Sequence, residues 1–67
     1  MSAFQRAGEV MKKMDDFAKE EPTEENRFKA LDVVKEASDV LDELTDPIAS
    51  QMIRERIGKL QTAMGWQ

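Results

Sequence analysis

The 67-residue sequence contains no cysteine, no histidine and no tyrosine. Without cysteine the chain can form neither a disulfide nor a cysteine-ligated zinc site. The serines, threonines and lysines that remain as nucleophiles do not stand beside a recognisable base, and no glycine-rich phosphate-binding motif is present. We therefore expect a protein that is not an enzyme and that holds no cofactor and no metal.

Long apolar runs are also missing from the sequence. No stretch approaches the roughly 20 apolar residues that cross a bilayer. Charged residues follow the first methionine closely, so the apolar segment of a secretion signal is not seen there. The expectation is a cytoplasmic protein that does not contact membranes.

What the sequence does contain is helical periodicity, in a chain that is 40% apolar and 36% charged. Apolar residues recur at spacings of three and four, which predicts helices at about 3–19, 24–44 and 47–64 in one domain, residues 1–67. Ser2, Thr23 and Asp46 are suited to cap the three helix N-termini. The fold class predicted is all-α, as a three-helix antiparallel bundle or a helical hairpin with a docked N-terminal helix.

The second predicted helix has an apolar arc that covers about half of its circumference. Such an arc is wider than the contact with one neighbouring helix requires, so we expect this helix to be the central one. For a chain of this length, apolar burial and ordering entropy nearly cancel. We therefore expect a homodimer in which the surplus apolar surface meets a second copy, with Leu31, Val33 and Val40 at the contact.

The third predicted helix and the C-terminus add three candidates for partner binding. Met52 has a flexible thioether that suits a core or an adaptable contact surface. Arg56 interrupts the apolar stripe of its helix, so it either extends to solvent or pairs with a carboxylate of another helix or chain. Gly65 is placed to end the helix in a left-handed conformation, and Trp66 then either covers the last turn or serves as an exposed anchor.

The formal charge of −4 is concentrated in the middle of the chain. Residues 22–45 hold three cations and seven anions, and four of the carboxylates follow one another at spacings of four, three and four: Asp32, Glu36, Asp39 and Glu43. This acidic ridge is interpreted as a solvated outer face, as a docking surface for a basic protein patch or, least favoured, as a metal site.

Two functional hypotheses remain. The first is a small protein–protein interaction module, such as an adaptor, inhibitor or assembly factor, that docks a helix face onto a larger protein. The alternative is a helix-turn-helix DNA-binding regulator that uses residues 47–57. The acidic charge and the length of the second helix argue against the alternative, so nucleic acid is not expected as a partner.

Overall fold

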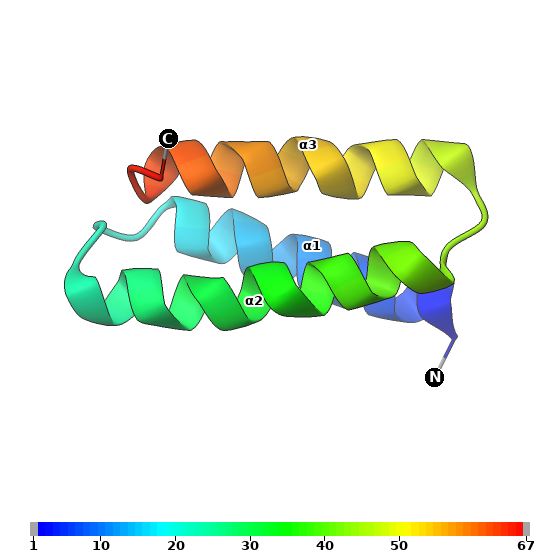
Figure 1. Cartoon of the computed structure of the whole chain (residues 1–67), viewed down its shortest axis with the longest axis horizontal. Helices are drawn as coiled ribbons and strands as arrows, with labels where there is room; N and C mark the ends of the chain where they lie inside the picture. The colour runs from blue at the N-terminus through cyan, green and yellow to red at the C-terminus, as the bar shows by residue number, and fades with distance from the viewer. Residues whose placement is uncertain (1, 67) are drawn as a thin grey trace.

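The computed structural model describes residues 2–66, and it consists of three helices packed together (Figure 1). Helix α1 spans Ala3–Ala18, α2 spans Glu24–Glu43 and α3 spans Pro47–Ala63. The connection from α1 to α2 lies at one end of the long axis and the connection from α2 to α3 at the other, so the chain passes along the axis three times. None of these helices is both long enough and apolar enough to cross a lipid bilayer.

An N-cap residue precedes each helix, and its side chain accepts a hydrogen bond from a backbone N–H of the first turn. Ser2 Oγ accepts from the Gln5 N–H at 3.2 Å, and the Gln5 side chain accepts from the Ser2 N–H at 3.3 Å, which forms a capping box. Thr23 Oγ1 accepts from the Asn26 N–H at 3.2 Å, and Asp46 Oδ1 accepts from the N–H two residues later at 3.0 Å. The caps satisfy donors that have no partner inside the helix, and so they fix where each helix starts.

The core lies along the axis where the three helices meet. All three helices contribute buried apolar side chains, and so does Met64, which directly follows α3. The largest fully enclosed side chains are Val10, Met14, Val40, Ile53, Leu60 and Met64. Smaller alanines from α1 and α2 fill the spaces between these side chains and let the helices approach closely.

Helix α1 is the central helix, and the prediction that the second helix would be central is wrong. α1 packs extensively against both α2 and α3, whereas α2 and α3 touch each other much less. The ion pairs between helices in residues 2–66 follow the same arrangement. Arg6 and Lys13 of α1 bind carboxylates of α2, and Asp15 of α1 binds Arg56 of α3. The width of the apolar arc therefore did not identify the helix that packs extensively against both of the others.

Val33 and Val40 lie in the core of the single chain, so the prediction that they form a surface contact is wrong. Val40 is completely enclosed and Val33 is 7% exposed. Both belong to the buried stripe of α2 that also contains Ala30 and Ala37. The wide arc of α2 is thus covered mainly by its own chain, and its surplus is confined to one edge, where Leu31 stays exposed.

Candidate functional site

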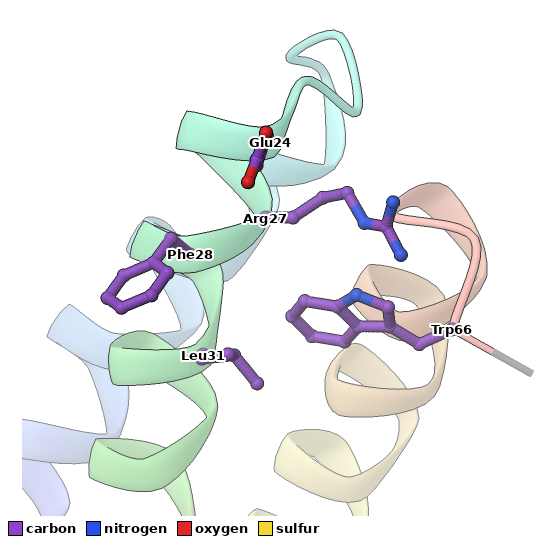
Figure 2. A pocket seen from close by; sticks show the side chains of 5 residues that line it. All are labelled: Glu24, Arg27, Phe28, Leu31 and Trp66. Atoms are coloured by element: carbon purple, nitrogen blue, oxygen red, sulfur yellow. The ribbon is translucent and has the colours of Figure 1, made fainter.

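An open apolar hollow of about 220 Å³ lies where the N-terminal half of α2 meets the residues that follow α3 (Figure 2). It is lined by Glu24, Arg27, Phe28, Leu31 and Trp66. Four of these residues come from two turns of α2, and Trp66 comes from the C-terminal end of the chain. Tertiary packing therefore assembles this surface from segments that are far apart in the sequence.

The position of Trp66 follows from the way that α3 ends. Gly65 has a φ of 75°, in the left-handed region that side chains disfavour and glycine tolerates. Its N–H donates to the Thr62 carbonyl at 3.1 Å, and the Trp66 N–H donates to the Gln61 carbonyl at 2.8 Å. This pair of bonds is a Schellman motif, which turns the chain back over the last turn of the helix. Trp66 is consequently half-buried and packs against the core.

Phe28 and Leu31 supply the exposed apolar part of the hollow. Phe28 is 72% exposed and Leu31 is 54% exposed, although both are large apolar side chains. They are three residues apart, so they share the outward face of α2. Phe28 also borders a second open hollow of about 520 Å³, together with Glu24, Glu25 and Lys29. Its ring therefore stands between two depressions of the surface.

Arg27 contributes a cation beside the single tryptophan. Its side chain extends from α2 toward Trp66, and its guanidinium lies above the indole in Figure 2. Arg27 and Trp66 both line the hollow, so a cation stands at the border of its apolar part. Sequence reasoning found Leu31 and Trp66 but missed Arg27 and Phe28. The position of Phe28 outside the apolar arc was the feature that could have identified it.

The acidic ridge predicted on α2 is divided between two environments. Glu36 Oε2 lies 3.2 Å from Lys13 Nζ, and Glu43 forms an ion pair with Arg6, so these two carboxylates are bound to α1. Asp32 and Asp39 are exposed and form no ion pair with any residue from 2 to 66. In the same part of the chain, no three acidic side chains are grouped so that they could hold a metal ion.

Arg56 and Met52 lie away from the hollow, on α3. The Arg56 Nε–H donates to Asp15 Oδ2 at 3.4 Å, which links α3 to α1 within the chain. Of the two interpretations of Arg56 offered by the sequence, pairing with a carboxylate of another helix is the one observed. Met52 is 39% exposed and follows Ile48, which is 72% exposed, by one turn. These two form a separate, smaller apolar strip on α3.

Comparison of the chain with models of protein families, with curated proteins and with solved structures returned no match.

Proposed function

We propose that this chain is a non-enzymatic protein–protein interaction module, built as an antiparallel three-helix bundle. Its binding surface is the one formed by Arg27, Phe28, Leu31 and Trp66, which we call the Trp66 surface. The observation that supports it best is the exposure of Phe28 and Leu31 around an open hollow, whereas the other apolar side chains of α2 are buried or partly buried.

The composition of the Trp66 surface supports this function. Tryptophan and arginine are enriched among the residues that dominate binding energy at protein interfaces, and aromatic side chains in general are enriched there. Trp66 is held in place by the Schellman motif and by core contacts, so little side-chain entropy is lost when a partner covers it. Phe28 and Leu31 project from a regular helix, which gives the partner a rigid template.

The alternative function, a DNA-binding regulator, has less support than the interaction module. Such a regulator would need a basic face on α3. The cations of α3 are Arg54, Arg56 and Lys59, and Arg56 is bound to Asp15. In addition, α2 and α3 contact each other less than either contacts α1. A helix-turn-helix unit depends on close packing of its two helices.

The test of the proposed function is affinity capture with three baits. The first is the wild-type chain, and the second carries Phe28→Ala and Leu31→Ala. The third is a control that carries Phe4→Ala, which truncates a large exposed apolar side chain that does not line the hollow. We expect a partner that the wild type and the control retain and that the Phe28/Leu31 variant loses. Circular dichroism should show the same helicity for all three, because none of these side chains belongs to the core. Equal retention by all three baits would contradict the assignment.

We also propose that the homodimer expected from the sequence uses a different contact from the one predicted. Val33 and Val40 are inside the bundle, and Ile48 and Met52 are exposed apolar residues one turn apart. Ile48→Glu places a carboxylate in the first turn of α3, where the helix dipole favours it, so the fold should persist. Sedimentation equilibrium should show weaker self-association for this variant. An unchanged association constant would exclude the α3 contact.

A further inference from the structure

We propose that the partner segment is a cationic amphipathic helix that lies along the outward face of α2. Its apolar side chains would pack on the Trp66 surface, and its cations would meet Asp32, Asp39 and Asp42. This inference rests on the proposed function and specifies the chemical class of the partner.

The outward face of α2 has two parts that follow one another along the helix. Phe28 and Leu31 form the apolar part at the N-terminal end, and the exposed Asp39 and Asp42 lie on the same side farther along. Residues 28 and 31 are three apart, as are residues 39 and 42, and the eight residues from 31 to 39 make about two turns, so all four positions lie on one face. From residue 28 to residue 42 the face is about 21 Å long at 1.5 Å per residue, which matches a partner helix of about four turns.

The apolar part of this face offers two hollows in which the side chains of a partner helix can pack. Phe28 lies between the hollow of about 220 Å³ and the hollow of about 520 Å³, and it borders both of them. Side chains that are one turn apart on a partner helix could therefore pack on either side of the Phe28 ring. Helix-in-groove binding uses such anchors at spacings of three, four and seven residues.

The charges on this face indicate that the partner carries positive charge. Asp32, Asp39 and Asp42 are exposed and form no ion pair within residues 2–66, and Lys35 is the cation that lies among them. The carboxylates that face α1, at positions 36 and 43, are bound by cations of α1. The uncompensated negative charge is thus on the outward side, where it attracts cations and repels phosphate backbones and anionic lipids.

The test uses an 18-residue amphipathic peptide with leucines on one face and lysines on the other, and a second peptide in which every lysine is replaced by glutamate. Neither peptide contains an aromatic residue, so the emission of Trp66, the single tryptophan of the chain, reports binding directly. We expect the lysine peptide to shift this emission to shorter wavelength and to bind at least about tenfold more tightly than the glutamate peptide. Equal affinity for the two peptides would overturn the inference.

Matched variants separate a specific site from general attraction to an acidic protein. Neutralising the face with Asp32→Asn, Asp39→Asn and Asp42→Asn should weaken binding of the lysine peptide about eightfold, at roughly a factor of two for each exposed ion pair. The control makes the same change in charge elsewhere, with Glu9→Gln, Asp16→Asn and Glu55→Gln, and should weaken binding less than twofold. Similar losses in the two triple variants would overturn the inference.

A third pair of measurements tests the apolar anchors. It also separates a failure of this inference from a failure of the proposed function. The variant with Phe28→Ala and Leu31→Ala should lose at least about tenfold in affinity for the lysine peptide, while the Phe4→Ala control keeps it. If the lysine peptide fails to bind but affinity capture still shows a partner lost by the Phe28/Leu31 variant, the interaction module stands and the cationic partner is refuted. If both experiments fail, the Trp66 surface itself is refuted.

Discussion

Val40→Ala tests whether this residue belongs to the core of one chain or to a contact between two chains. Val40 is completely enclosed by its own chain. The substitution removes two carbon atoms, and at about 0.8 kcal/mol for each buried methylene the lost transfer free energy is about 1.6 kcal/mol. The cavity left behind adds to this, and the higher helix propensity of alanine offsets a few tenths. We expect the free energy of unfolding to fall by about 2 kcal/mol.

Such a loss is large for a bundle of this size, because a single core in a chain of about 70 residues rarely supplies more than about 3–5 kcal/mol. The midpoint of thermal unfolding should fall by about 8–16 °C, at roughly 4–8 °C for each kcal/mol. Leu31→Ala is the control on the same helix. Leu31 is exposed, so its truncation should change the free energy of unfolding by less than about 0.5 kcal/mol.

The assay is urea unfolding followed by circular dichroism at 222 nm, at two protein concentrations that differ fiftyfold. If Val40 packs inside one chain, the difference between the variant and the wild type is the same at both concentrations. If Val40 lay between two copies, the difference would shrink on dilution, because both proteins would then be monomers. A loss that disappears on dilution, or a variant with the wild-type midpoint, would refute the core position.

Three further predictions concern helix stability and the contact between α1 and α3. Gly8 and Gly58 are exposed inside helices, and a Cβ at either position would meet open space. Gly8→Ala and Gly58→Ala should therefore each raise the free energy of unfolding by about 1 kcal/mol. Thermal unfolding checks this, and a lower midpoint would show that the added methyl group meets a neighbour. Gly65→Ala should instead destabilise the chain by about 1–2 kcal/mol and shift tryptophan emission to longer wavelength, because φ is 75° there; unchanged emission would argue against the Schellman motif. A double-mutant cycle with Asp15→Asn and Arg56→Gln should give a coupling of about 0.5 kcal/mol that weakens with salt, and a coupling of zero would show that the ion pair contributes no stability.

Much of the local structure could be predicted from the sequence, because its causes are local. Ser2, Thr23 and Asp46 cap the helices where the sequence placed caps, and each helix ends within one residue of its predicted end. Gly65 has the left-handed backbone expected after the last helix. Hydrogen bonds between neighbours in the chain determine all of these features, and such bonds depend little on how the helices pack.

The candidate site was predicted in part. Leu31 and Trp66 were identified as surface candidates, and both line the hollow. Phe28 and Arg27 were missed, because helical periodicity marks residues that face a core and not exposed residues that a distant segment approaches. The acidic ridge was identified as a row of four carboxylates. Which of these carboxylates form ion pairs depends on the cations of α1, which lie more than 20 positions away in the sequence.

The sequence predicts three amphipathic helices and the residues at which each begins and ends. The packing of the helices is what makes α1 central, turns Val33 and Val40 inward and brings Trp66 to the same hollow as α2. The physical reason is that periodicity gives the direction of an apolar face relative to its own helix, whereas burial depends on which neighbours cover that face. In this chain α1 and α3 cover most of the wide arc of α2, and Leu31, at the edge that they leave open, forms part of the Trp66 surface.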